Sequence, residues 1–399
     1  MKQEHLYAIA LTRIGGFNLP ALMELYQKAG SATVVYEHRH NICDILPDAT
    51  PHLVEVLKNW DNILPFAERE LQYDEQNNIE VLCLNDVNYP QRLRECPDAP
   101  LVLYKRGNVN LNKQHTLNII GTRNCTQYGR DLIRVFIREL KSICPDALVF
   151  SGLAYGIDIC AHRESLANNI ETVGVVAHGL DMVYPRMHTG TAKEMCEKGG
   201  GIITEYTTNT QPMPKNFVQR NRIVAGCTDA TLLVESANKG GGLITCSIAR
   251  SYNREVFAFP GSIGAEYSEG CNHLIRDNVA SLVTSAYDFV KAMNWDNDIK
   301  IETRHRAHVV PKPGQRRTNS SGGSPATERP ANQHAFSTNQ FSYGTPYGFA
   351  FRAGNERNSK DYGWRLLPFV GGLSGGAKLN TTELNAKHSS PITHQAKSD

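Results

Sequence analysis

Short apolar segments alternate with longer amphipathic segments through the centre of the chain, from about residue 117 onward. A strand that is buried on both faces reads as a continuous apolar run, and helices between such strands return the chain to begin the next parallel strand. The pattern therefore predicts an α/β fold with a parallel sheet that is covered by helices on both faces. The predicted strands span residues 117–120, 147–150, 172–177, 202–205, 230–234 and 256–259.

The segment between the first two predicted strands, DLIRVFIRELKSIC, has apolar residues at helical spacing. Such a stripe is typical of a helix that packs on a sheet, so its members are predicted to be core residues and not functional ones. The predicted stripe consists of Leu132, Val135, Phe136, Leu140 and Ile143.

The first seventy residues show helical spacing on both sides of a glycine break, Gly15-Gly16. The apolar positions are Leu6, Ile9 and Ala10 before the break and Leu22, Leu25 and Tyr26 after it. A small helical module is predicted over residues 1–70. A glycine-bearing turn between two helices can present backbone N–H groups to a phosphate, as in helix-hairpin-helix DNA binders; a structural helical cap explains the pattern equally well.

The remaining chain divides into two parts of different composition. Residues 71–294 carry the strand and helix pattern and are predicted to form the main domain. Residues 295–399 are rich in Ser, Gly, Asn, Pro and Gln and have no periodicity, so they are predicted to be a low-complexity, disordered tail.

Charge and cysteine usage narrow the class of protein. From Lys300 onward lie 14 of the 42 basic but only 6 of the 40 acidic residues, so the part before it is mildly acidic. A nucleic-acid surface on that part must therefore be a local basic patch. The ten cysteines occur singly between Cys43 and Cys271, which favours reduced thiols, and the isolated histidines predict no metal site.

The sequence predicts a cytoplasmic protein that does not contact a membrane. No apolar run approaches the roughly 20 residues of a membrane helix. The N-terminus MKQEHLYAIALTRIGG has charges and glycines where a signal peptide is apolar.

Glycines and cations gather at the carboxyl ends of the predicted strands, where ligands bind in open parallel sheets. Small residues there allow a phosphate to approach the backbone, and arginines can contact it with two hydrogen bonds. A phosphate-bearing ligand, either a free nucleotide or a nucleic acid, is therefore predicted at this edge. The segments are Gly121-Thr122-Arg123, SGLAYGID at 151–158, AHGLD at 177–181 with YPR at 184–186, KNFVQRNR at 215–222 and KGGGLIT at 239–245.

Several enzyme signatures are missing from the sequence. Neither G-x-x-x-x-G-K-[ST] nor a strand-following G-x-G-x-x-G occurs, and no G-x-S-x-G is present. No catalytic residue and no cofactor is predicted.

In order and spacing, GTRNCTQYG, SGLAYGIDICAH, VAHGLDMVYP, FVQRNRIVAG, KGGGLIT, FAFPGSIG and EGCNHLI resemble the DprA/Smf family of bacterial natural transformation, over roughly residues 89–290. The resemblance implies an extended Rossmann-like fold and binding of single-stranded DNA with little sequence preference. It further implies a homodimer that protects incoming DNA and loads the RecA recombinase, and it implies no enzymatic activity. The frequent C-terminal winged helix of the family has no counterpart in the tail.

The resemblance also implies site residues. Around the DNA-binding pocket it places Arg123, Gly152, Arg186, Phe217, Arg220, Asn221, Arg222 and Thr245, and proximity adds Lys215 and Lys239. The dimer surface is expected near residues 270–275, with Leu274 and Ile275.

Alternatives remain for several of these residues. Phe217 fits a core position equally well. Arg220 and Arg222 flank Asn221 and cannot point the same way on a regular helix or strand, so one of them could be buried against a carboxylate such as Asp229 or Glu235.

Two other functions share the strand-end glycines. One is an enzyme of the lysine-decarboxylase-like group that processes nucleoside monophosphates, although KGGGLITCSIAR lacks the acid of that group's motif. The other is a nucleotide sensor.

Overall fold

A computed structural model describes residues 2–14 and 19–295. The predicted disordered tail lies outside the described residues except for its first residue, Trp295. Its assignment to the tail is wrong, because the Trp295 ring is buried and packs on Phe289 in the core. Within the described ranges, no helix is both long enough and apolar enough to cross a membrane.

The chain begins with a helical module, as predicted, but its last helix runs past the predicted end at residue 70 to Gln76. Its caps fit the sequence, since the Ser31 hydroxyl accepts a hydrogen bond from the backbone N–H of Val34 and Thr50 caps a helix that starts at proline. Trp60 is fully buried, and the rings of Tyr7 and Tyr36 pack against it. The helices are α1 (Lys2–Arg13), α2 (Leu19–Ala29), α3 (Ala32–Glu37), α4 (Pro51–Lys58) and α5 (Leu64–Gln76).

A nine-stranded sheet follows, in the order β1-β2-β6-β5-β4-β3-β7-β8-β9. The six predicted strands are confirmed as β3 to β8, with ends shifted by one or two residues. Three strands were not predicted: the antiparallel β1 and β2 at one edge and the short β9 at the other. The strands are β1 (Ile79–Cys83), β2 (Val102–Arg106), β3 (Thr116–Ile120), β4 (Leu148–Ser151), β5 (Thr172–Val175), β6 (Gly201–Thr204), β7 (Ala230–Leu233), β8 (Glu255–Ala258) and β9 (Ser281–Leu282).

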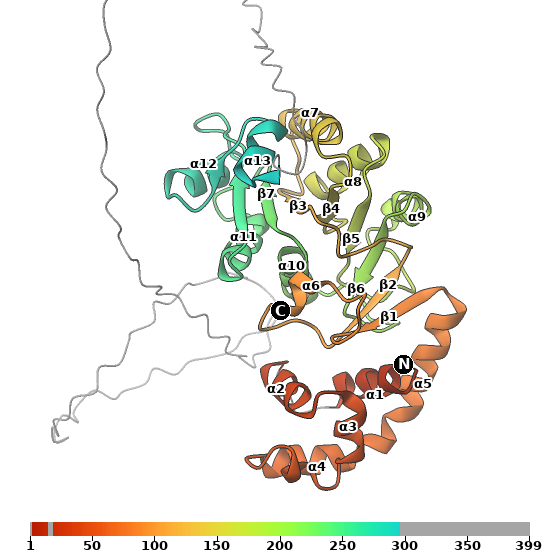
Figure 1. Ribbon diagram of the computed structural model, residues 1–399. Helices are drawn as coiled ribbons and strands as arrows, with labels where there is room; N and C mark the ends of the chain where they lie inside the picture. The colour runs from red at the N-terminus through yellow and green to blue at the C-terminus, as the bar shows by residue number, and fades with distance from the viewer. Residues whose placement is uncertain (1, 15–18, 296–399) are drawn as a thin grey trace, which may run out of the picture. The chain divides into compact units, whose positions relative to one another are not determined.

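Helices cover both faces of the sheet (Figure 1). On one face Leu117 and Ile119 of β3 pack with α7, α8 and α13, while α10 and α11 pack on the other face. The helices of this domain are α6 (Gln91–Arg94), α7 (Gln127–Ile143), α8 (Ile157–Ala167), α9 (Thr189–Glu197), α10 (Pro214–Gly226), α11 (Gly241–Ser251), α12 (Glu269–Arg276) and α13 (Ala286–Ala292).

The buried stripe of α7 differs in part from the prediction. Phe136, Leu140 and Ile143 are buried as expected, but Ile133 and Ile137 complete the stripe. Val135 is 40% exposed, because the helix is rotated so that the arc centred on residues 133, 136–137 and 140 faces the sheet.

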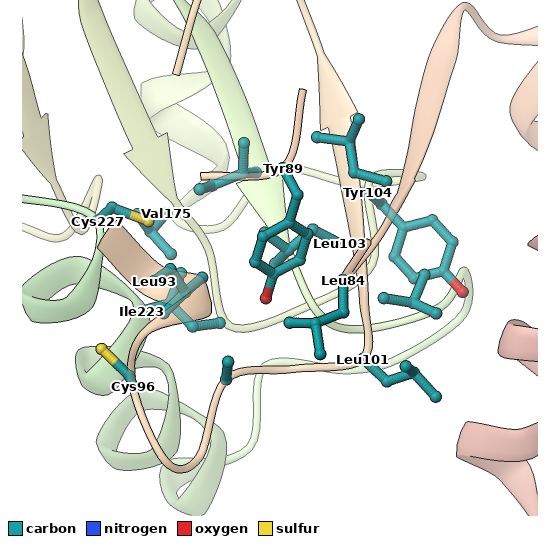
Figure 2. Packing of buried hydrophobic residues seen from close by; sticks show 14 of the residues in the cluster. Leu84, Tyr89, Leu93, Cys96, Leu101, Leu103, Tyr104, Val175, Ile223 and Cys227 are labelled. Carbon is teal, nitrogen blue, oxygen red and sulfur yellow. The ribbon is translucent and has the colours of Figure 1, made fainter. Parts of the chain in front are cut away.

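The segment that contains β1, α6 and β2 packs through apolar side chains against α10. Figure 2 shows Leu93 and Cys96 beside Ile223 of α10 and Cys227, which follows that helix, with Tyr89 close to Leu103. The hydroxyl of the fully buried Tyr89 donates a 2.6 Å hydrogen bond to the carbonyl of Pro100. This packing fixes one side of α10, the helix that carries several candidate site residues.

The strand order reverses at β3. The chain moves outward from β3 through β4 and β5 to β6, and then returns through α10 to place β7 on the other side of β3. The loops after β3 and β7 therefore leave the sheet toward opposite faces, and the Thr122 N–H of the first donates a 2.8 Å hydrogen bond to the Glu235 carbonyl of the second. In open α/β sheets, ligands bind at the carboxyl ends of the strands beside such a point of reversal.

Candidate nucleic-acid interface

Arg123 and Phe217 meet at the carboxyl edge of the sheet. Arg123 follows β3 and is exposed, and its guanidinium carbon lies 5.3 Å from the centre of the Phe217 ring on α10. The ring of Tyr184 lies on Phe217 edge-on, with 5.8 Å between the ring centroids. A guanidinium over an aromatic face keeps its charge available to an anion while the ring fixes its position.

Phe217 is half-buried and belongs to neither apolar core cluster of the described residues. Tyr184 is 44% exposed. The two rings therefore offer partly open aromatic faces next to a cation. Tyr184 lies in the predicted segment YPR at 184–186, but it was not predicted as a site residue.

Arg220 lies under this surface and is 3% exposed. Its Nη1 donates to the carbonyl oxygens of Gly152, at 2.6 Å, and of Val175. Burial lowers the pKa of Arg220 to about 10, although the nearby Asp158 acts in the opposite direction. Through these hydrogen bonds, the buried Arg220 side chain connects the carboxyl ends of the neighbouring strands β4 and β5.

Gly152 is surrounded by buried charged groups. Its N–H donates to Oδ2 of Asp158 at 3.1 Å, and a Cβ at this position would lie 2.6 Å from that oxygen and 2.6 Å from Nη2 of Arg220. Burial raises the pKa of Asp158, while the Arg220 guanidinium lowers it. Glycine is therefore required for Asp158 and Arg220 to approach the backbone from two sides.

Arg222 points away from Arg220, as two residues separated by about 200° on a helix must. It is 6% exposed and forms an ion pair with Glu205, at the end of β6. Burial raises the pKa of Glu205, and the Arg222 charge opposes that rise.

The suggested carboxylate partners Asp229 and Glu235 are wrong, because both are already engaged. Asp229 pairs with Arg92 at 2.5 Å. Glu235 accepts a 2.9 Å hydrogen bond from the backbone N–H of Thr126, so its carboxylate occupies the positive N-terminus of α7. A phosphate cannot bind at that helix end without displacing Glu235.

The N-termini of α8 and α11 differ from that of α7. Their N-cap residues are Gly156 and Gly240, which have no side chain to accept a hydrogen bond. Gly156 has φ of 76°, and a Cβ there would lie 2.2 Å from the carbonyl oxygen of Thr122. The backbone of Thr122, in the loop that carries Arg123, therefore packs directly against the first residues of α8.

The other predicted site residues occupy different environments. Arg186, Lys215 and Lys239 are exposed. Asn221 is partly buried on α10, and Thr245 is 3% exposed on α11. The structure thus shows direct contact within two pairs, Arg123 with Phe217 and Gly152 with Arg220.

A cavity of about 510 Å³ borders the N-terminal part of α10. Lys215, Asn216 and Gln219 line it from α10, and Arg13 lines it from α1. Basic and amide side chains therefore continue from the Phe217 surface toward the helical module.

One group of potential metal ligands is found within residues 2–14 and 19–295: His5, Cys83 and Asp86. Oδ2 of Asp86 lies 3.0 Å from Nε2 of His5 and accepts a 2.7 Å hydrogen bond from the Cys83 N–H. These contacts join α1 to the turn after β1 without a metal. Sequence spacing did not indicate the group because His5 is remote from the other two residues.

Comparison with known proteins shows what the chain is similar to in sequence and fold. The profile of the DNA recombination-mediator protein A family matches residues 80–294. The DNA processing protein DprA of Streptococcus pneumoniae is 35% identical over 232 residues, which are 56% of this chain and 79% of that protein. Protein Smf of Escherichia coli is 33% identical over 228 residues, 57% of this chain and 60% of that protein. The X-ray structure of the pneumococcal protein matches with a TM-score of 0.61 and 32% identity, covering 72% of this chain and 97% of that chain.

Proposed function

The chain belongs to the DNA recombination-mediator protein A (DprA/Smf) family, and from this premise we propose that it binds single-stranded DNA at the carboxyl edge of its sheet. The observation that carries the proposal is the contact of Arg123 with Phe217, bordered by Tyr184, at the point where the strand order reverses. A single strand needs cations for its phosphates and flat rings for its unpaired bases. This surface offers both.

The exposed cations have the role of phosphate ligands in this proposal. Arg123 and Arg186 follow β3 and β5, Lys239 precedes α11, and Lys215 lies in the first turn of α10. Backbone N–H groups at the glycine-capped start of α11 supply further donors without side-chain bulk. At the start of α8 the N–H of Ile157 already donates to the Thr122 carbonyl. Since the part of the chain before Lys300 is mildly acidic, binding depends on this local patch and weakens with salt.

The buried polar residues position the surface and do not touch DNA. Arg220 holds the carbonyls of Gly152 and Val175, and Arg222 neutralises Glu205. Thr245 and Asn221 lie on α11 and α10, behind the exposed residues of the same helices. We assign Gly152, Arg220, Asn221, Arg222 and Thr245 to the support of the DNA surface.

The biological role that we propose follows from the family. The chain is a non-enzymatic cytoplasmic mediator that protects incoming single-stranded DNA and loads the RecA recombinase during natural transformation or recombination. We propose a homodimer formed through α12, where Leu274 and Ile275 are partly buried and pack only in part on the core. A dimer would align two DNA surfaces and raise the apparent affinity for one strand that reaches both.

Fluorescence anisotropy with an oligo-dT of about 30 nucleotides tests the proposal, because affinity for single strands is set by stacking and counterion release. The full chain should bind at low salt and bind less at higher salt, and Arg123→Glu should lose most of the affinity. The matched control is Arg138→Glu, the same charge change at an exposed residue in the second half of α7. Equal losses in both variants would refute a specific site at Arg123.

Further measurements distinguish binding of single-stranded DNA at this surface from the alternative functions and from DNA binding by the tail. A free nucleotide that competes at a concentration comparable to that of the oligonucleotide would indicate a sensor. Release of base from AMP would indicate the nucleoside-monophosphate enzyme. A chain truncated after Trp295, which keeps that buried ring in the core, should retain most of its affinity, whereas loss of binding in that truncation alone would place the DNA on the tail.

A further inference from the structure

His5, Cys83 and Asp86 bring three kinds of metal ligand to one point between α1 and the end of β1. A ring nitrogen, a thiol sulfur and a carboxylate oxygen all lie within 4.8 Å of one another. His5 lies on α1, Cys83 is the last residue of β1, and Asp86 follows three residues later. Ligand atoms around a tetrahedral zinc ion lie about 3 to 4 Å apart, so small side-chain rotations would close this group around one ion.

The turn from Cys83 to Asp86 is fixed by hydrogen bonds. The Asp86 N–H donates to the Cys83 carbonyl at 2.8 Å, and the Cys83 N–H donates to Oδ2 of Asp86 at 2.7 Å. The Arg94 guanidinium donates to the carbonyl oxygens of Leu84 and Asp86 on the same turn. Two of the three ligands are therefore held close together before an ion binds, which lowers the cost of ordering them.

The third ligand completes the group and leaves it open to water. Nε2 of His5 lies 3.0 Å from Oδ2 of Asp86, and the side chains of the two residues are 18% and 26% exposed. A metal ion would take the place of the proton in this contact, and Nδ1 of the ring would then carry the hydrogen. An ion can therefore reach the group from solvent, and a water molecule can occupy the position that no side chain fills.

The Cys83 thiol is buried and has no hydrogen-bond partner among the residues that the structure describes. Burial and, to a smaller extent, the charges of Asp86 and Glu4 raise the pKa of this thiol, so it keeps its proton in the absence of an ion. A dication would replace that proton and offset the two carboxylates. Metal binding and loss of the thiol proton therefore occur together.

We propose that His5, Cys83 and Asp86 bind one zinc ion through Nε2, the thiolate sulfur and a carboxylate oxygen, with water as the fourth ligand. A thiolate and an imidazole favour zinc over magnesium and calcium, which prefer oxygen ligands alone. The ligands come from the helical module and from the edge of the sheet, so the ion joins the two and links folding to zinc. This site is independent of the proposed DNA surface.

Cobalt titration of the full chain tests the site, because cobalt(II) in a tetrahedral site has visible absorption bands and its bond to a thiolate adds a near-ultraviolet band. The reduced chain is freed of metal by a chelator, and CoCl₂ is added. The wild type should develop both kinds of band at one equivalent and lose them when ZnCl₂ displaces the cobalt. All cysteines lie between residues 43 and 271, so histidines after residue 295 cannot produce the thiolate band.

Three single variants assign the ligands. His5→Gln and Asp86→Asn should each weaken cobalt binding at least tenfold, since loss of an outer-shell partner alone costs about 10- to 100-fold. Cys83→Ser should abolish the thiolate band. The matched controls Cys43→Ser and His52→Gln change exposed residues and should bind cobalt as the wild type does. Circular dichroism checks that each variant folds, and His5→Gln, at a partly exposed position, decides the matter if the buried Cys83→Ser does not.

Urea unfolding measures the link to folding. At free zinc about 100 times the Kd, the folding equilibrium constant of the wild type should rise about 100-fold, and that of His5→Gln should change far less. Absence of the thiolate band in the wild type, or its persistence in a folded Cys83→Ser, would refute the site. Equal cobalt affinity of the wild type, His5→Gln and Asp86→Asn would refute it as well.

Discussion

The guanidinium of Arg123, from the loop after β3, lies over the ring of Phe217, from α10, with 5.3 Å between its carbon and the ring centre. The two residues are far apart in sequence, and the crossing from β6 back to β7 brings α10 beside the end of β3. Arg123 carries a positive charge, and Phe217 has a partly exposed aromatic ring. Their contact makes them the natural place to test whether bases stack here.

Replacing Phe217 by Leu should weaken oligo-dT binding by about 5- to 150-fold, because stacking of one base on an aromatic ring contributes about 1 to 3 kcal/mol. Phe217→Tyr keeps the ring and should bind within about twofold of the wild type. Anisotropy titrations at one fixed salt concentration measure both. If Leu and Tyr bind alike, the ring does not stack on DNA.

Replacing Arg222 by Met should destabilise the fold by about 3 to 5 kcal/mol, because it leaves the buried Glu205 carboxylate without its partner. Adding Glu205→Leu should recover most of that loss, since the unpaired charge is then gone. Urea unfolding of the two single variants and the double variant gives the coupling energy. Direct contact of Arg222 with DNA predicts a different result: the double variant would be stable and still lose oligo-dT binding.

The strands of the fold were predictable where burial on both faces of the sheet produces a continuous apolar run in the sequence. Strands β3 to β8 lie inside the sheet and are buried on both faces, so each shows as an apolar run. Strand β2 was missed because it ends in Lys105 and Arg106, and these charged residues interrupt the apolar run that marks an interior strand. Lys105 nevertheless lies 7% exposed and pairs with Glu80 on the neighbouring β1, a contact that requires the sheet to be known.

The site was predictable as a set of residues and less so as an arrangement. Helical phase dictates that Arg220 and Arg222 separate, but it does not say which carboxylate each one meets. Glu205 follows a strand that is adjacent only in space, so spacing could not identify it as the partner of Arg222. Likewise Tyr184 becomes part of the site only through its contact with Phe217.

Replacing Gly152 by Ala should destabilise the protein by about 1 to 3 kcal/mol, because the new methyl group meets buried groups that have no room to move. A Cβ would lie 2.6 Å from both Arg220 and Asp158. Gly190→Ala is the matched control, since a Cβ there meets nothing within 4 Å. That change lies in α9 and should be neutral or mildly stabilising. Equal urea midpoints for the two variants would contradict the close approach at Gly152.

Replacing Asp74 by Asn should make the protein less sensitive to rising pH. Asp74 is 2% exposed, and both of its carboxylate oxygens lack a hydrogen-bond partner among the described residues. Burial and, to a smaller extent, the charge of Glu70 raise the pKa of Asp74 from 3.8 to about 8, although Arg106 acts in the opposite direction. At neutral pH the folded protein therefore keeps a proton on Asp74 that the unfolded chain has released.

Because the folded state binds the extra proton, the wild type loses stability as pH rises between the two pKa values, by up to about 1.4 kcal/mol per pH unit from this group. Asn cannot ionise and removes that loss, so the advantage of Asp74→Asn over the wild type should be small at pH near 4 and grow toward pH near 8. Urea unfolding at several pH values within this window measures the difference. The neighbouring Glu75→Gln, at a residue whose side chain is 71% exposed, should follow the wild type at every pH. A constant offset between Asp74→Asn and the wild type would show that Asp74 is ionised in the folded protein.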